Sequence, residues 1–101
     1  MSKAPPLPRV TLYSKPDCHL CDIAKARIAN VRKRVSFALE TVDITTHPDL
    51  FERHKERIPV VLINGEEAFV YRVSEKHLTR KLRALHPRSS IWERLARPGP
   101  A

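Results

Sequence analysis

A continuous apolar run near the middle of the chain constrains the fold more than any other feature. Ile58 to Ile63 (IPVVLI) contains no polar side chain, as expected of a central strand buried on both faces. Asn64-Gly65 follows directly, and both residues adopt positive φ readily, which favours a tight hairpin. Ala68 to Arg72 would be the returning strand. The run therefore predicts a buried strand with an antiparallel neighbour at the sheet edge.

The N-terminal part of the chain has the pattern strand, helix, strand. Arg9 to Ser14 (RVTLYS) is rich in β-branched and aromatic residues, which is typical of a short strand. After the breaker Lys15-Pro16-Asp17, apolar residues recur at helical spacing from Cys18 to about Arg34. Alternation then predicts a second strand from Val35 to about Ile44. Because the helix connects the two strands, they should be parallel, and the crossover connection should be right-handed.

Two further helices are predicted on either side of the hairpin. Thr46 and Asp49 resemble a capping box, which indicates a helix from about His47 to Arg57. Ser74 would cap the last helix, and His86-Pro87 would end it. The predicted buried stripe of that helix consists of Leu78, Leu82 and Leu85. The expected fold is α/β, in the order β-α-β-α-β-β-α, with a four-stranded mixed sheet and three flanking helices.

The length of 101 residues fits one domain. We place it at residues 9–86, between a flexible segment at 1–8 and a basic tail at 87–101. In the tail, Ser90 and Glu93 form another capping box. This predicts a short helix that docks on the domain or anchors a partner.

The formal net charge of +8 is unevenly distributed. Residues 1–75 carry a net charge of +2, whereas residues 76–101 carry +6. No RNA-binding or zinc-finger signature accompanies this basic region, so nucleic acid is not expected as a main partner. No apolar run approaches the ~18–20 residues that cross a membrane, and the N-terminus has no hydrophobic signal core. We therefore expect a cytoplasmic monomer that has no membrane contact, and two cysteines are too few for a disulfide scaffold.

Cys18-His19-Leu20-Cys21 is the motif with the clearest chemistry. Cys18 should fall at the N-terminus of the first helix, where unpaired N–H groups and the helix dipole favour a thiolate. Cys21 lies one turn further on the same face and should be more sheltered. An exposed thiolate that attacks a disulfide, with a second thiol that resolves the mixed disulfide, is the basis of dithiol exchange.

Other uses of the cysteine pair stay open from the residues alone. Two incidental buried cysteines are the structural alternative. A zinc site needs four ligands, and the sequence has no second cysteine pair or paired histidine motif. An iron–sulfur or other metal carrier would use the same thiolates. A redox-sensing adaptor that acts through the basic C-terminus is a further alternative. We expect no resident metal.

The stretch from Val10 to Cys21 (VTLYSKPDCHLC), together with Arg57-Ile58-Pro59-Val60, resembles a glutaredoxin-like protein of the thioredoxin superfamily. The resemblance covers about residues 9–85. It implies a thioredoxin-like fold and a thiol–disulfide oxidoreductase that serves cell redox homeostasis. In that reaction Cys18 would be the nucleophile and Cys21 the resolving thiol.

The resemblance also implies substrate-binding residues. Pro59 would be cis and face the two sulfurs, and Ile58 would offer backbone hydrogen bonds to the substrate. Lys15 would stabilise the thiolate and Arg57 would hold a glutathione carboxylate, although both could equally be solvated surface residues. From its position beside Cys18, a partly charged His19 would also stabilise the thiolate.

The chain departs from the glutaredoxin pattern in two places. Glutaredoxins carry a Gly-Gly pair and an acidic helix start after the fourth strand, whereas this chain has Val70-Tyr71-Arg72-Val73-Ser74-Glu75. His19-Leu20 replaces the familiar Pro-Tyr between the cysteines. We expect protein or low-molecular-weight disulfides as partners and no bound cofactor, with glutathione as a candidate reductant or co-substrate. Residues 45–57 have room for one short helix only, which disfavours an arsenate-reductase-like branch.

Overall fold

The structure, a computed structural model, describes residues 7–85. Its elements follow the predicted order β-α-β-α-β-β-α and confirm the α/β class. They are β1 (Arg9–Ser14), α1 (His19–Arg32), β2 (Ala38–Asp43), the 3₁₀ turn η1 (Ile44–Thr46), α2 (Pro48–His54), β3 (Val60–Ile63), β4 (Glu66–Val70) and α3 (Glu75–Leu85). The predicted tail helix beyond residue 86 lies outside the described residues.

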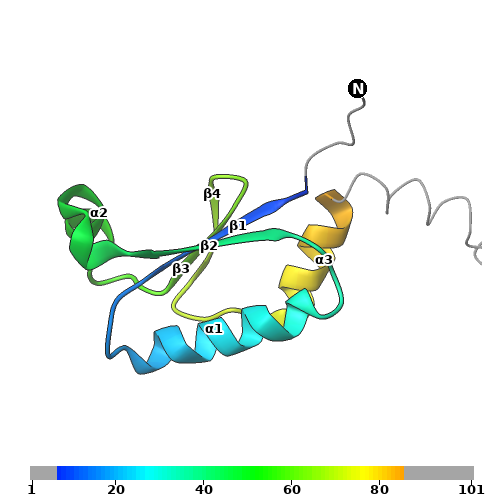
Figure 1. Cartoon of the computed structure of the whole chain (residues 1–101), viewed down its shortest axis with the longest axis horizontal. Helices are drawn as coiled ribbons and strands as arrows, with labels where there is room; N and C mark the ends of the chain where they lie inside the picture. Colours follow the sequence, from blue (N-terminus) through cyan, green and yellow to red (C-terminus); the bar gives the residue numbers. More distant parts are fainter. Residues whose placement is uncertain (1–6, 86–101) are drawn as a thin grey trace, which may run out of the picture.

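The four strands form one mixed sheet in the order β2-β1-β3-β4 (Figure 1). β1 pairs with β2 in parallel, as the crossover predicts, and β1 with β3 and β3 with β4 are antiparallel. The pairing begins before β1, because the Pro8 carbonyl accepts a hydrogen bond from the Ala38 N–H at 2.9 Å. Pro8, which is buried, is therefore joined to the sheet.

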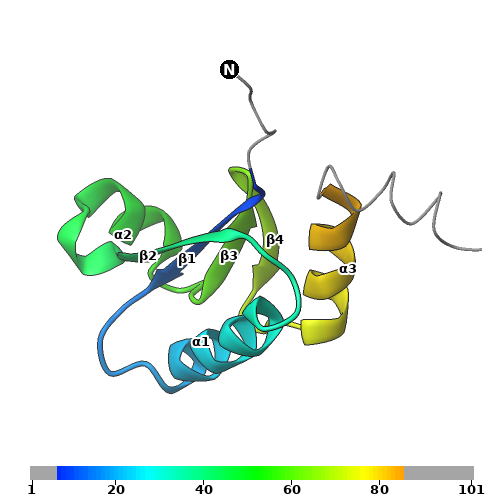
Figure 2. The same ribbon diagram turned by 45° about the vertical axis from the view of Figure 1, so that its right-hand side comes forward.

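The main core lies between the sheet and the helices α1 and α3, which lie together on one face (Figure 2). Leu12 on β1 and Val61 on β3 are directly opposite each other in register and both are buried. They pack in one cluster with Ile28 of α1 and Leu82 of α3. The continuous apolar run of β3 is thus buried as its sequence predicts, because it occupies an interior position of the sheet.

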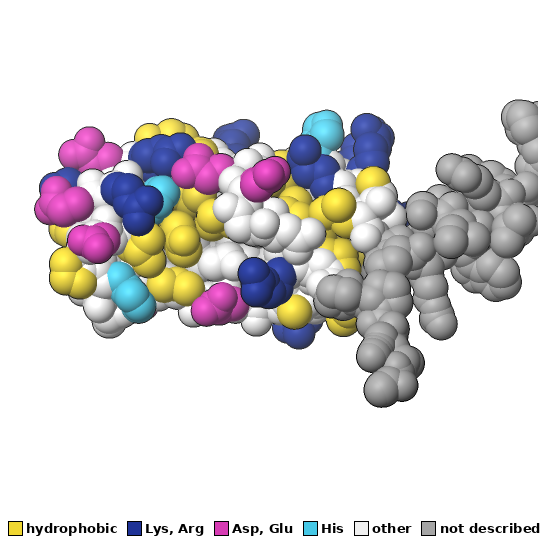
Figure 3. Space-filling model, turned by 90° about the horizontal axis from the view of Figure 1, so that it is seen from above, with side chains coloured by type: hydrophobic (Ala, Val, Ile, Leu, Met, Phe, Trp, Pro, Cys, Tyr) yellow, Lys and Arg dark blue, Asp and Glu magenta, His cyan; other side chains and the backbone are white. Residues whose placement is uncertain are grey.

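The helix α2 lies at the other end of the sheet from α3, next to η1 (Figures 1 and 2). A second, smaller cluster consists of Cys21, Ile44 and Ile58, with Leu50 and Phe51 of α2 packed against it. On the face seen in Figure 3, opposite α1, acidic and basic side chains are interspersed around apolar surface. No helix within residues 7–85 is long and apolar enough to cross a membrane.

The predicted hairpin is confirmed, because Asn64 and Gly65 both have positive φ, at 51° and 86°. The strand boundaries differ from the prediction by a few residues. β2 begins at Ala38 instead of Val35, although Val35 and Phe37 are buried in the preceding loop. Alternating burial therefore starts before the hydrogen-bonded ladder does. The alternation in the sequence predicts which side chains are buried, but not where strand pairing begins.

The capping box predicted for α2 is wrong. The N-cap of α2 is His47, which makes no side-chain cap hydrogen bond. Thr46 Oγ1 instead donates to the Asp43 carbonyl at 2.9 Å, and the Asp43 carboxylate accepts from the Thr45 N–H. The inserted 3₁₀ turn directs the threonine hydroxyl back toward β2. The helix ends at His54, three residues before the predicted Arg57.

The buried stripe predicted for α3 is only partly correct. Leu78 and Leu82 are fully buried, but Leu85 is 46% exposed. Leu85 borders an open depression of about 300 Å³ between the end of α3 and the β3–β4 hairpin. Ala68 and Ala84, which also line this depression, are too short to fill it, so the last leucine stays accessible to solvent.

Candidate functional site

The two cysteines occupy different positions at the start of α1. Cys18 is the N-cap, with extended φ and ψ of −115° and 110°, and its sulfur accepts the Cys21 N–H at 3.3 Å. A sulfur at this position faces backbone N–H groups that have no partner within the helix. Cys18 is partly accessible to solvent, whereas Cys21 is 0% exposed. The predicted contrast between an accessible and a sheltered thiol is present.

Burial controls the protonation of Cys21. Removal from water, followed by the hydrogen bond and charge of Cys18, raises the pKa of the Cys21 thiol to about 11. A hydrogen bond with the Lys15 backbone, which outweighs the Cys18 charge, and the weaker Lys25 charge lower the pKa, but burial keeps the net shift upward. Cys21 is therefore a neutral thiol at pH 7 while Cys18 is reduced.

The Ile58–Pro59 peptide bond is cis, as the resemblance implies. Both residues are buried. Ile58 belongs to the small cluster that contains Cys21, and Cys18 packs against this cluster. The segment entering β3 thus lies against the cysteine pair, although more than thirty residues separate them in the sequence.

Lys15 and His19 flank Cys18 along the chain, and both side chains are exposed. Lys15 lies in the loop after β1, and His19 is the first residue of α1. Neither side chain makes a hydrogen bond or an ion pair with another residue of the described range 7–85. Both are free to meet a substrate, and their roles in binding stay predictions.

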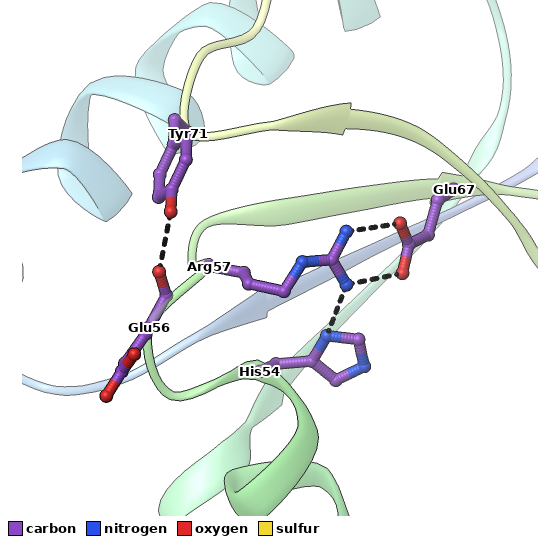
Figure 4. A network of polar contacts seen from close by, with 5 residues as sticks. All are labelled: His54, Glu56, Arg57, Glu67 and Tyr71. Atoms are coloured by element: carbon purple, nitrogen blue, oxygen red, sulfur yellow. Dashed lines mark hydrogen bonds and ion pairs between the residues drawn. The ribbon is translucent and has the colours of Figure 1, made fainter.

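Arg57 has a partner that the sequence did not indicate. Its guanidinium donates two hydrogen bonds to the Glu67 carboxylate of β4, at 2.7 and 2.9 Å (Figure 4). The pair is partly exposed, and the bond raises the pKa of Arg57 and lowers that of Glu67. The group that the resemblance assigns to a glutathione carboxylate therefore already binds a carboxylate of this chain.

His54 and Tyr71 complete this network and were also missed by the sequence analysis. His54 is buried, its Nδ1 lies 3.4 Å from Arg57, and its ring centroid is 5.0 Å from that of Tyr13. Burial, followed by the Arg57 charge, lowers the pKa of His54. The helical spacing of His54 from Leu50 and Phe51 is the one sequence signal that could have placed it on the buried face.

Tyr71 lies in the corner between β4 and α3. Its hydroxyl donates to the Glu56 carbonyl at 2.7 Å (Figure 4). Its N–H donates to the Pro59 carbonyl at 2.8 Å. It has a φ of +72°, a region that aromatic residues rarely adopt. Nothing local in the sequence predicts this contact, because it joins two loops. Within residues 7–85, no group of three or more His, Cys, Asp or Glu is arranged to hold a metal ion.

The sheet order, the three helices and the cysteine pair at the start of α1 define a class: a protein of thioredoxin fold with a Cys-X-X-Cys motif. Comparison with solved structures agrees. A thioredoxin from Halobacterium salinarum superposes with a TM-score of 0.60 at 13% identity, over 78% of this chain and 74% of that one. At this identity the similarity concerns the fold alone.

More particularly, the chain belongs to the glutaredoxin-like domain family (DUF836), whose pattern matches residues 9–83. An uncharacterized protein of Mycobacterium tuberculosis is 29% identical over 76 residues, and the match covers 70% of this chain and 78% of that protein.

Two structures from other bacteria are also similar. An X-ray structure from X. campestris is 32% identical with a TM-score of 0.63, over 74% of this chain and 96% of that one. A solution structure from Nitrosomonas europaea has a TM-score of 0.68 at 23% identity, over 81% of this chain and 99% of that one.

Proposed function

We propose that this protein is a dithiol thiol–disulfide oxidoreductase. The observation that carries the proposal is the asymmetry of the cysteine pair: Cys18 is accessible at the helix N-terminus, and Cys21 is buried one turn behind it. The accessible sulfur can meet a disulfide in solution, and the buried one can react only with Cys18. Family membership in the glutaredoxin-like domains supports the same reaction.

The reaction has two exchange steps. The Cys18 thiolate attacks one sulfur of a substrate disulfide, which forms a mixed disulfide and releases the other substrate sulfur as a thiolate. Cys21 loses its proton to solvent and attacks the Cys18 sulfur, which releases the second substrate thiol. The Cys18–Cys21 disulfide that results holds the oxidising equivalents, because two electrons have passed to the substrate. A cellular thiol then returns these electrons.

The surroundings of Cys21 suggest why it attacks after the mixed disulfide has formed. Two of the causes that raise its pKa, a hydrogen bond and a charge, come from the Cys18 sulfur. A mixed disulfide at Cys18 removes both of them, so the pKa of Cys21 falls once the substrate is bound. A larger fraction of Cys21 is thus thiolate in the mixed disulfide than in the reduced protein, which favours the resolving step.

Separate replacement of each cysteine tests this function. Cys18→Ser should reduce the disulfide reductase rate by at least about a hundredfold, because the attacking sulfur is lost. Cys21→Ser should instead accumulate a mixed disulfide at Cys18, visible by mass spectrometry as the mass of the substrate thiol. Circular dichroism of both variants checks that the fold is retained.

Full reductase activity in Cys18→Ser would refute the assignment of the nucleophile. Stoichiometric iron or zinc in the purified protein would favour the metal-carrier alternative instead. Equilibration of the wild-type protein in glutathione buffers, with the adduct masses determined, gives its reduction potential and shows whether glutathione serves as the electron donor.

A further inference from the structure

Tyr71 is tied at two points to the segment that enters β3. Its backbone N–H donates to the Pro59 carbonyl and its hydroxyl donates to the Glu56 carbonyl, at 2.8 and 2.7 Å. Figure 4 shows the side chain standing beside this segment, near the first turns of α1. Its ring is held in place, and 50% of the residue is still exposed.

A small groove lies between this ring and α1. Two arginines, Arg27 and Arg72, line it, and its apolar part consists of Leu20, Ile23, Ala24, Tyr71 and Val73. Leu20 is the residue directly before Cys21 and is 45% exposed. Leu20, beside the cysteine pair, and Tyr71, which lines the same groove, thus both stay exposed.

The size of the groove limits what can bind. Its volume is about 70 Å³, room for a few water molecules and therefore for one side chain, but not for a whole tripeptide. Its charge is positive, because Arg27 and Arg72 are the ionisable residues that line it. Arg57, on the opposite side of Tyr71, is already paired with Glu67. The surroundings favour an apolar side chain with acidic neighbours.

We propose, on the basis of the thiol–disulfide exchange inferred above, that Tyr71 is a specificity-determining residue for polypeptide disulfides. With Leu20, it forms a subsite for an apolar side chain adjacent to the half-cystine that Cys18 attacks. Arg27 and Arg72 attract acidic residues beyond that side chain. The protein therefore prefers polypeptide disulfides of this kind to the disulfide of glutathione.

Matched peptide disulfides test the subsite. The first peptide carries Leu on both sides of the half-cystine, followed by Asp residues. The second carries Ser in place of Leu, and the third keeps Leu but carries Lys in place of Asp. We expect kcat/KM of the wild-type protein to be about tenfold higher for Leu than for Ser, the selectivity typical of a small apolar pocket. The Lys peptide and glutathione disulfide should both react more slowly than the Leu peptide with Asp, and the Asp preference should weaken as salt is added.

Two substitutions separate the ring from the hydroxyl group. Tyr71→Gly removes the ring at a position whose φ suits glycine, so the Leu-to-Ser ratio should fall to about one. Tyr71→Phe keeps the apolar ring and should keep the ratio within about twofold of wild type. Because each ratio is measured within one variant, a general loss of activity cancels.

Leu85→Ser is the matched control. Leu85 is about as exposed as Tyr71 (46% against 50%), but it borders the depression between the end of α3 and the β3–β4 hairpin. This variant should keep the wild-type ratio. An unchanged ratio in Tyr71→Gly, a ratio near one in wild type, or faster reduction of glutathione disulfide than of the Leu peptide would overturn the subsite.

The small neutral substrate 2-hydroxyethyl disulfide separates the two proposals. If wild type reduces it but shows no Leu preference, the subsite is wrong and the oxidoreductase function stands. If wild type reduces none of these disulfides, the proposed function itself fails.

Discussion

At the scale of single residues, the two sulfurs differ because one caps a helix and the other is inside it. Cys18 precedes the first helical residue, so its side chain meets unpaired backbone N–H groups. Cys21 is in the first turn and points into a cluster with Ile44 and Ile58. The same side chain is therefore an accessible thiol at one position and a buried thiol at the other.

The raised pKa of Cys21 leads to a prediction for alkylation. With a pKa of about 11, only about one Cys21 in ten thousand is a thiolate at pH 7. Reduced protein treated with iodoacetamide should be labelled first at Cys18. Once Cys18 is labelled, its hydrogen bond and charge no longer raise the pKa of Cys21, but burial still does. Labelling of Cys21 should therefore stay slow at pH 7 and accelerate as the pH rises toward 10, as quantified by tandem mass spectrometry.

The Cys18→Ser variant is the control for this measurement. Burial is the largest cause of the raised Cys21 pKa, and it persists without the neighbouring thiol, so the pH dependence should remain. Equal labelling of both cysteines at pH 7 in wild type would show that Cys21 is not protected.

At the scale of elements, tertiary contacts fix the start of α3. Ser74 caps the helix, since its Oγ accepts the His77 N–H at 3.2 Å. Two bonds join this end to α1: Asn30 donates to Glu75, and Arg27 donates to the Val73 carbonyl, both at 3.0 Å. The corner that holds Tyr71 therefore has a fixed position relative to the cysteine pair.

The other end of α3 offers a matched test of its packing. Leu82 is fully buried between the sheet and α1, whereas Leu85 is largely exposed. Leu82→Ala should lower the free energy of unfolding by ~2–5 kcal/mol, because it leaves a cavity in the core. Leu85→Ala should change it by less than about 0.5 kcal/mol, and urea unfolding measures both. Equal losses would show that Leu85 is buried in the folded protein.

At the scale of the whole molecule, the free energy of unfolding should depend on pH through His54. Its pKa is lowered by burial and by Arg57, so the unfolded chain, with a histidine pKa of about 6.5, binds this proton at higher pH than the folded protein. The contribution of His54 to the free energy of unfolding is therefore fully present above about pH 6.5. It is lost as the pH falls toward the lowered pKa of His54 in the folded protein.

Urea unfolding at pH 7.5 and 5.5 tests this dependence in wild type and in His54→Phe, which keeps an aromatic ring beside Tyr13. The variant should lose the decrease between the two pH values. Asp43 and Glu67, whose pKa values are also lowered, contribute below about pH 4.5 and so do not affect this window. Parallel profiles for the two proteins would exclude His54 as the source.

Much of the fold was predictable because it follows from local patterns. The strand at Arg9–Ser14, the helix behind Cys18, the buried run of β3 and the Asn64-Gly65 turn each depend on neighbouring residues only. The position of both cysteines at a helix start follows from the same patterns. The resemblance added the cis bond at Pro59, which periodicity does not reveal.

The remaining features depend on contacts between residues distant in sequence. Arg57 pairs with Glu67, and Tyr71 bonds to Glu56, because the turn at Asn64-Gly65 folds β4 back along β3. That return pairs Arg57 with a carboxylate of β4 and brings the Tyr71 ring to the groove beside α1. The elements and the position of the cysteine pair follow from local backbone preference and periodicity, so the sequence is enough to predict them. The surroundings of the pair depend on how distant strands and loops pack, so they could be known from the folded structure alone.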